Sequence, residues 1–299
     1  MSSIARIVAS NMVRKLMMKG FVLGMALLAG LAATPARAQT AGEMKSASPE
    51  TRPGETEEQH GRRLLDEMVE ALGGNAWLEK KTSYSEGQVA AFFRGQPTGS
   101  VVRFVQYKRF ATPASPELTR TEYLTVRGVI MPGMKKDVAH LWTADNGYEV
   151  TYKGQVALPS AQVADFMRKR AHSIEEVMRS WVKQKDVVIL YEGIGMRDRH
   201  AVDKVSILGA NNDAVEIELD QDTHLPLQRS FEWRNEQFQD HDLDEEVYGD
   251  WRYFQGVATP MNMTTYRNGD MASQTFYTKV RFNDPMSDDL WDRTKLLKK

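Results

Sequence analysis

The sequence of 299 residues contains no cysteine. This absence excludes disulfide bonds, thiolate metal sites and a cysteine nucleophile. An excess of basic charge is also missing. Of the 39 basic and 40 acidic side chains, five basic and no acidic ones lie in residues 1–38, which leaves a formal charge of −6 for the rest of the chain. Binding to nucleic acid needs clustered Lys and Arg, so we expect no nucleic-acid partner.

The apolar run Phe21–Ala33 has 13 residues, whereas a membrane-spanning helix needs about 20. A basic segment precedes this run, and a small-x-small site, Ala36-Arg37-Ala38, follows it. This order is typical of a secretory signal peptide. We therefore expect residues 1–38 to be cleaved after Ala38, which would release a soluble periplasmic protein. Either Met1 or Met12 can be the start, and an uncut membrane anchor is the alternative.

Recognisable catalytic and metal-binding motifs are missing as well. The six histidines are scattered, and the sequence contains no H-E-x-x-H, G-x-S-x-G or phosphate-binding loop. The acidic segment Asp240–Asp250 suggests a calcium loop, but Glu245 and Trp251 stand where such a loop needs Gly and Glu. We interpret this segment as a solvated turn or strand edge. We expect no metal, no cofactor and no catalysis, with a hydrolase as the weakest alternative.

The residues after the signal are enough to fill a core, since 41% of the sequence is hydrophobic. Residues 39–58 are rich in Ser, Thr, Pro, Gly and Glu and are predicted to form a flexible leader. Apolar residues then recur at helical spacing from residue 60 to residue 72, where Gly73-Gly74 ends the pattern. We expect residues 59–299 to form a single domain that begins with this amphipathic helix.

Most of the domain is predicted to be β-strand. Short runs of β-branched and aromatic residues alternate with Gly, Pro and Asn clusters, as in an antiparallel meander. The predicted strands are 84–94, 100–109, 121–127, 139–144, 187–191, 201–208, 214–219, 227–236, 251–254, 261–267 and 273–282. Residues 145–147 (Asp-Asn-Gly) indicate a hairpin turn.

A helical insert, residues 160–185, interrupts the strands. His172 and Ser173 are expected to divide it, with Ser173 capping the second helix and Glu176 completing the cap. One face of the sheet is expected to be continuously apolar, and a long twisted sheet curls. The fold class is therefore mainly β with helices: an unclosed antiparallel barrel of about eleven strands, covered by the first helix and by a helical lid.

Two helices are too few to fill the concave side of such a sheet, so an apolar pocket is expected there; a dry, fully packed core is the alternative. Methionine-rich walls suit a flexible ligand. The residues predicted to line the pocket are Phe93, Phe104, Phe166, Met167, Met178, Trp181, Phe231, Trp233, Met261 and Met263.

Several short motifs resemble the periplasmic lipoprotein-carrier superfamily (LolA/LolB-like), above all its outer-membrane lipoprotein-sorting homologues. The likeness covers roughly residues 62–291 and consists mostly of turn motifs. These are Ala71-Leu-Gly-Gly74 with Trp77-Leu78, Ser85-Glu-Gly87, Asp145–Val150 with Tyr152–Gly154, Ile217–Asp220 with Thr223–Pro226, Pro260–Asn262, and Arg267–Gly269 with Val280–Asn283.

The resemblance implies an unclosed barrel whose helices close over an apolar cavity that receives acyl chains of lipids or lipoproteins. Envelope membrane proteins would be further partners. In that family a basic residue just after the first hairpin matters for handover, and Lys108 and Arg109 lie near the matching place. The segment Pro113–Pro116 and the long insert depart from the pattern. A lipoprotein carrier, a carrier of another lipid, and a sensor or protein-interaction module with an incidental cavity therefore remain alternatives.

Overall fold

The computed structural model describes residues 52–127, 133–209, 213–235 and 239–298. The chain divides into two units, Met1–Ser48 and Pro49–Lys299. The expected signal peptide and the expected leader up to residue 51 lie outside the described residues. All of the described residues belong to the second unit.

The second unit is built on one antiparallel sheet, which has 13 strands in the described part of the chain. The strands are β1 (Thr82–Phe93), β2 (Gln96–Arg109), β3 (Leu118–Arg127), β4 (Gly133–Trp142), β5 (Gly147–Val150), β6 (Gln155–Ala157), β7 (Val188–Arg197), β8 (His200–Leu208), β9 (Ala214–Asp220), β10 (Pro226–Asn235), β11 (Asp240–Phe254), β12 (Val257–Arg267) and β13 (Asp270–Phe282).

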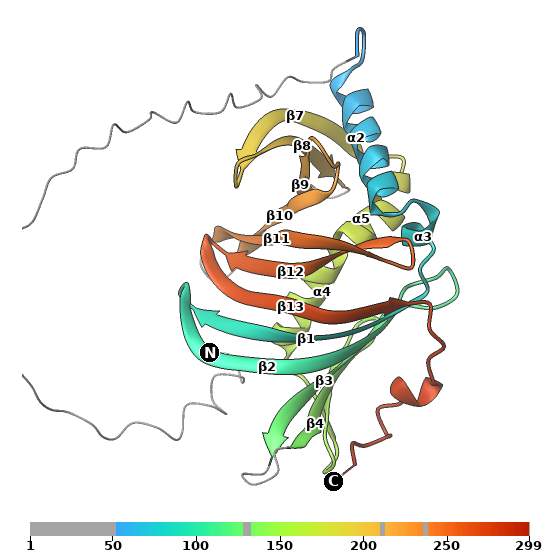
Figure 1. The fold of residues 1–299 in the computed structure, drawn as a ribbon, viewed down its shortest axis with the longest axis vertical. Coiled ribbons are helices and arrows are strands. Elements are labelled where there is room, and N and C mark those ends of the chain that lie inside the picture. Colours follow the sequence, from blue (N-terminus) through green and yellow to red (C-terminus); the bar gives the residue numbers. More distant parts are fainter. Residues whose placement is uncertain (1–51, 128–132, 210–212, 236–238, 299) are drawn as a thin grey trace, which may run out of the picture. The chain divides into compact units, whose positions relative to one another are not determined.

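The order of the strands explains why the chain needs a helical insert. The chain enters in the middle of the sheet at β1, runs outward to the edge strand β6, and resumes at the opposite edge with β7. It then returns strand by strand to β13, which pairs with β1 (Figure 1). The helices α4 (Ser160–Ala171) and α5 (Ile174–Arg179) make the crossing between the two edges. The edges do not pair with each other, so the predicted unclosed antiparallel sheet is confirmed.

Two short strands, β5 and β6, account for the difference between thirteen strands and the expected eleven. They follow the predicted turn at residues 145–147, where the Thr143 N–H donates to the Asn146 carbonyl at 2.8 Å. The strand expected at 251–254 also begins much earlier, at Asp240. It lies between β10 and β12 in the sheet.

The interpretation of Asp240–Asp250 as a solvated turn or edge is therefore wrong. Asp244 is 0% exposed, because its carboxylate faces Arg229, which is also 0% exposed, at 3.4 Å. A pair of opposite charges on neighbouring strands makes this burial tolerable. The segment Asp240–Asp250 contains no Lys or Arg, so the cations that pair with Asp244 could not be recognised from it.

The first helix, α2 (Glu57–Leu72), begins and ends by local signals. Thr56 and Gln59 form a capping box at its start, and the N–H of Gly74 donates to the Val69 carbonyl at its end. The helix packs against β7, and Gly61 allows the close approach, since an added Cβ would lie 3.0 Å from the Ile189 side chain. The apolar face of α2 lies in the main core with residues of α5, β7–β10, β12 and β13.

The face that lines this core is not continuously apolar, contrary to expectation. A β-bulge lies in β1 and β13, where Glu86 pairs with Lys279 but Gly87 pairs with Tyr277. The extra residue shifts the alternation, so Phe276 lies outside the core that contains Val280 and Phe282. Such a shift reverses which side chains face inward.

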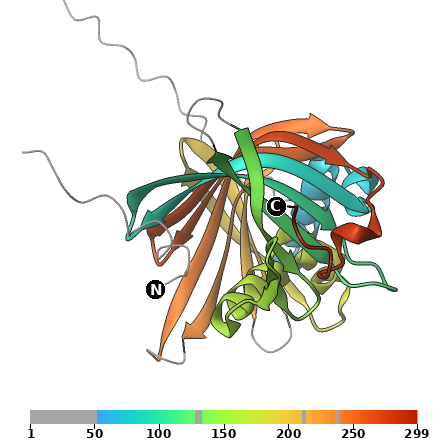
Figure 2. The same ribbon diagram turned by 90° about the horizontal axis from the view of Figure 1, so that it is seen from below.

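The insert divides at His172, as expected. Ser173 caps α5, and its side chain accepts the Glu176 N–H at 3.3 Å. The two helices differ in burial: α5 buries Ile174, Val177 and Met178, whereas α4 has no buried residue. Figure 2 shows both helices on the inner side of the curved sheet. Within the described residues, no helix is long and apolar enough to cross a membrane.

Candidate functional site

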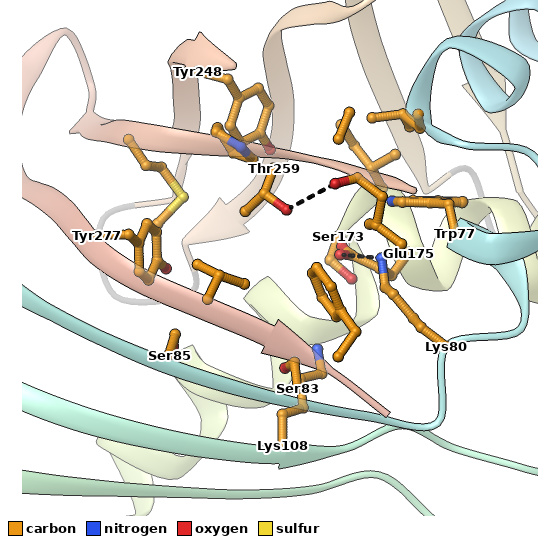
Figure 3. A pocket seen from close by; sticks show the side chains of 18 of the residues that line it. Trp77, Lys80, Ser83, Ser85, Lys108, Ser173, Glu175, Tyr248, Thr259 and Tyr277 are labelled. Atoms are coloured by element: carbon orange, nitrogen blue, oxygen red, sulfur yellow. Dashed lines mark hydrogen bonds and ion pairs between the residues drawn. The ribbon is translucent and has the colours of Figure 1, made fainter. Parts of the chain in front are cut away.

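A cavity of about 240 Å³ lies between the inner side of the sheet, the short helix α3 (Asn75–Leu78) and the start of α5 (Figure 3). Strands β1, β2, β11, β12 and β13 supply its other walls. Its volume is close to the lower end of the about 300–1,000 Å³ that is usual for small-molecule pockets. The cavity can therefore hold one small ligand.

One part of the wall is apolar. It consists of Leu72, Trp77, Ile174, Val257, Val280 and Phe282. These residues come from α2, α3, α5, β12 and β13, and all six also belong to the main core. The cavity is thus a space left beside the packed core, as expected when two short helices cover a long curled sheet.

Lys80 lies at the junction of this apolar wall with a polar one. Only 4% of Lys80 is exposed. Its Nζ lies 4.2 Å from the centroid of the Trp77 ring and 5.2 Å from that of Phe110. It also donates to Glu175 Oε1 at 3.3 Å. Burial lowers the pKa of Lys80 to about 8, although the nearby Glu175 carboxylate raises it in part. Lys80 is still mainly protonated at neutral pH.

Glu175 in the first turn of α5 is the counterion. Its side chain is 34% exposed and lines the cavity. Burial disfavours its charged form, but the ammonium groups of Lys80 and Lys108 outweigh burial and lower the pKa of Glu175 to about 2. Glu175 is therefore ionised throughout the physiological range.

Lys108 of β2 reaches into the same end of the cavity (Figure 3). Its Nζ pairs with Glu117 Oε2 at 3.0 Å and lies 4.8 Å from the centroid of the Phe110 ring. Ser83 of β1 pairs with Lys108 in the sheet and lines the wall beside it, whereas Ser85 lies farther along β1, on the side of Tyr277 (Figure 3). This end therefore combines two ammonium groups with a hydroxyl group.

The opposite end carries a second buried charge pair. Glu246 of β11 accepts from the Tyr248 hydroxyl at 2.9 Å and pairs with Arg229 Nη2 at 2.8 Å. Burial disfavours ionisation of Glu246, but Arg229 outweighs it and lowers the pKa of Glu246. Tyr277 also lines this end (Figure 3). The negative charge there is neutralised within the protein.

The structure places two of the predicted site residues, Met263 and Lys108, in this cavity. Three others, Met178, Phe231 and Met261, belong to the main core. Phe231 stacks on the His172 ring with a centroid distance of 4.2 Å. Phe104 is 6% exposed and packs edge-on against Tyr277 at 5.9 Å.

The remaining aromatic and methionine residues lie around α4 or at the surface. Phe166 stacks on Trp142, and Met167 and Trp181 line a separate groove of about 440 Å³. Trp233 lies between two guanidinium groups, those of Arg168 and Arg267, at 4.5 and 4.8 Å from its ring. Phe93 is 66% exposed near the β1–β2 turn, so it does not join the others.

Arg109 lies apart from Lys108. Neighbouring residues of a strand point to opposite faces, and Arg109 pairs with Asp288 at 2.8 Å in the segment after β13. Its guanidinium also lies over the Trp291 ring at 5.1 Å. Of the two basic residues, the structure therefore brings only Lys108 to the cavity.

Sequence reasoning missed Lys80, Glu175, Ser83, Ser85 and Tyr248. The charged pair Lys80–Glu175 joins residues 95 positions apart, and no local pattern links them. Lys80 lies two residues after Leu78 and three after Trp77, and this nearness is the only sequence signal that an ammonium group adjoins an apolar helix. In the described residues, no group of three or more His, Asp or Glu side chains is arranged to hold a metal ion.

The fold is similar to that of several solved structures. A DUF1329 family protein from Desulfovibrio piger matches with a TM-score of 0.53 and 14% sequence identity, over 79% of this chain and 98% of that chain. A putative outer membrane lipoprotein-sorting protein domain from Vibrio parahaemolyticus matches with a TM-score of 0.51 and 10% identity, over 78% of this chain and 97% of that one. No family model and no curated protein sequence matches the chain. At these identities the likeness establishes the fold alone, and it is the fold that the LolA-like resemblance implies.

Proposed function

We propose that this protein binds acyl chains of lipids or lipoproteins in the cavity under α5 and carries them through the periplasm without catalysis. The observation that carries the proposal is the cavity itself: a space of about 240 Å³ beside an apolar core, on the inner side of an unclosed sheet. The similar Vibrio structure is named as a putative outer membrane lipoprotein-sorting protein domain, which supports the same class of ligand.

The energetics of such binding need no elaborate polar site. Each buried methylene group contributes about 0.8 kcal/mol, so about eight of them would contribute roughly 6 kcal/mol before the entropic cost of association. The volume suits one short or partly inserted chain. A lipoprotein with several long chains would need the cavity to enlarge.

The helix α4 is the element that we propose to move. It has no buried residue, and it is held by contacts at its surface. Arg267 Nη2 donates to Asp165 Oδ1 at 2.6 Å, and the Phe166 and Trp142 rings stack at a centroid distance of 3.9 Å. Helix α5, by contrast, belongs to the core and would stay in place. We therefore assign the lid role to α4 rather than to the whole insert.

The periplasmic location rests on the signal-like segment, residues 1–38. The basic start, apolar run and small-x-small site of that segment are the support for export. The alternative function, a protein-interaction module using the acidic segment Asp240–Asp250, has less support, because Asp244 is fully buried.

A cavity-filling variant tests the proposal. Ser85 is 7% exposed and lines the cavity. The larger side chain of Ser85→Phe should fill this space and abolish the binding of a fluorescent fatty acid. The matched control is Gln88→Phe in the same strand, outside the cavity lining, which should bind normally. Native mass spectrometry of the wild-type protein from an envelope fraction should show bound lipid. A lipid-free mass together with no fatty-acid binding would reject the proposal.

A further inference from the structure

We propose that the ligand is a single-chain amphiphile whose anionic head group, a carboxylate or a phosphate, binds between Lys80 and Lys108. This inference rests on the proposed function and names the chemistry of the ligand. The acyl chain would then extend from these two ammonium groups along the wall that contains Met263 and Tyr277.

Three cations surround one phenyl ring at this end of the cavity. The charged groups of Lys80, Lys108 and Arg179 lie 5.2, 4.8 and 4.6 Å from the centroid of Phe110. Cations packed against an aromatic ring in a partly dry site repel one another and attract an anion strongly. Their arrangement is therefore suited to a negatively charged group.

Carboxylates of the protein do not fully balance these cations. Lys80 pairs with Glu175 and Lys108 pairs with Glu117. Arg179 donates to the Lys80 carbonyl at 3.1 Å. Its Nε is buried without a hydrogen-bond partner among the described residues. Among the described residues, two carboxylates lie within ion-pair distance of Lys80 and Lys108, and Glu175, Glu117 and Glu176 act on Arg179 only from farther away, so no carboxylate contacts the Arg179 guanidinium.

The polar wall gives a second, independent indication. The hydroxyl group of Ser83 lines the cavity beside Lys108, and that of Ser85 lines it farther along β1. A pure hydrocarbon in this position would cover these groups without a hydrogen bond, which costs about 1–3 kcal/mol for each group left unpaired. An anionic head group can accept hydrogen bonds from the hydroxyl and ammonium groups together.

Glu175 competes with the ligand under this proposal. Its carboxylate contacts Lys80, and its side chain is 34% exposed and lines the cavity. A ligand anion would share or replace this contact, so removal of the Glu175 charge should strengthen anion binding. Removal of a lysine charge should weaken it. If Lys80, Lys108 and Glu175 only stabilised the fold, these opposite changes in the affinity for an anion would not be expected.

The experiment compares ten-carbon probes that differ only in the head group: decanoate, decyl phosphate, decanol and decyltrimethylammonium, titrated calorimetrically at pH 7. The wild-type protein should bind an anion at least about tenfold more tightly than decanol and should bind the cation least. Lys108→Met should lose this preference and retain decanol binding. Glu175→Gln should bind the anion more tightly. Lys81→Met is the control, since Lys81 is adjacent to Lys80 but exposed and outside the lining.

Lys80→Met alone would leave Glu175 without its counterion, so Lys80→Met combined with Glu175→Gln is used if the single variant does not fold. The double variant should also lose the anion preference. Tighter binding of decanoate than of decyl phosphate identifies a fatty-acid-like head group, and the reverse order a phosphate. Equal affinity for decanol and both anions would overturn the head-group inference and leave the proposed function intact. Failure of all four probes to bind would reject the proposed function itself.

Discussion

Helix α4 should open far more easily than helix α5, although the two are separated only by His172 and Ser173. The difference follows from burial, since α5 contributes residues to the main core and α4 has no buried residue. Local opening of α4 should therefore cost much less than global unfolding.

The magnitude can be worked out from the contacts of α4. Asp165 pairs with Arg267 at 2.6 Å, and Lys169, which is partly exposed, pairs with the buried Asp244 at 3.3 Å. Because each pair has at least one partly exposed partner, each contributes about 0.5–1 kcal/mol. The hydrogen bond from Arg170 to the Thr143 carbonyl at 2.8 Å adds about 1 kcal/mol. The stack of Phe166 on Trp142 adds about 1 kcal/mol. The contact of Arg168 with the Trp233 ring at 4.5 Å adds about 0.5–1 kcal/mol. The sum of roughly 3.5–5 kcal/mol does not exceed the lower end of the roughly 5–15 kcal/mol expected for global unfolding.

Native-state hydrogen exchange measures this opening directly. Asp165→Ala should lower the opening free energy of α4 by about 1 kcal/mol, which corresponds to roughly fivefold faster exchange. Exchange in α5 should not change. High salt should have a similar effect on the wild-type protein, because it screens the partly exposed ion pairs. Equal protection of α4 and α5, with both unaffected by Asp165→Ala, would refute the assignment of α4 as the moving element.

Three further results are expected. Phe231→Asp places a charge in the main core and should lower the free energy of unfolding, measured by chemical denaturation, by more than about 3 kcal/mol. Phe93→Asp changes an exposed site and should lower it by less than about 0.5 kcal/mol. Similar decreases for the two variants would contradict the placement of Phe231 in the core. The pKa of Glu175 is lowered from 4.5 to about 2. The stabilisation from its ionised form should therefore be complete above pH 4.5 and be lost as the pH falls towards 2. The free energy of unfolding of Glu175→Gln should fall less over this interval, and the same pH dependence in the variant and the wild-type protein would count against the ion pair. Top-down mass spectrometry of exported protein should find Gln39 at the amino terminus, and an intact Met1 or Met12 terminus would contradict the signal-peptide prediction.

The local elements of this fold could be predicted because their causes are local. The apolar spacing of α2 and its end at Gly73-Gly74 lie within one stretch of chain and were predicted, whereas its start, with the cap at Thr56 and the first residues Glu57 and Glu58, falls in the segment that was wrongly expected to be a flexible leader. The division of the insert at His172 and its cap at Ser173 are also local and were predicted. Regular short strands with tight turns were likewise enough to predict an antiparallel meander, and with it an unclosed sheet.

The cavity was decided by contacts between distant residues. Lys80 and Glu175 meet only because the insert crosses from β6 to β7 and places the start of α5 over β1 and β2. Arg229 and Asp244 neutralise each other across two neighbouring strands, so a charged pair occupies a face that alternation alone predicted to be apolar. The bulge at Gly87 reversed the alternation in β13. Spacing along a strand specifies which residues share a face, but bulges and charge pairs between strands decide what that face presents to a ligand.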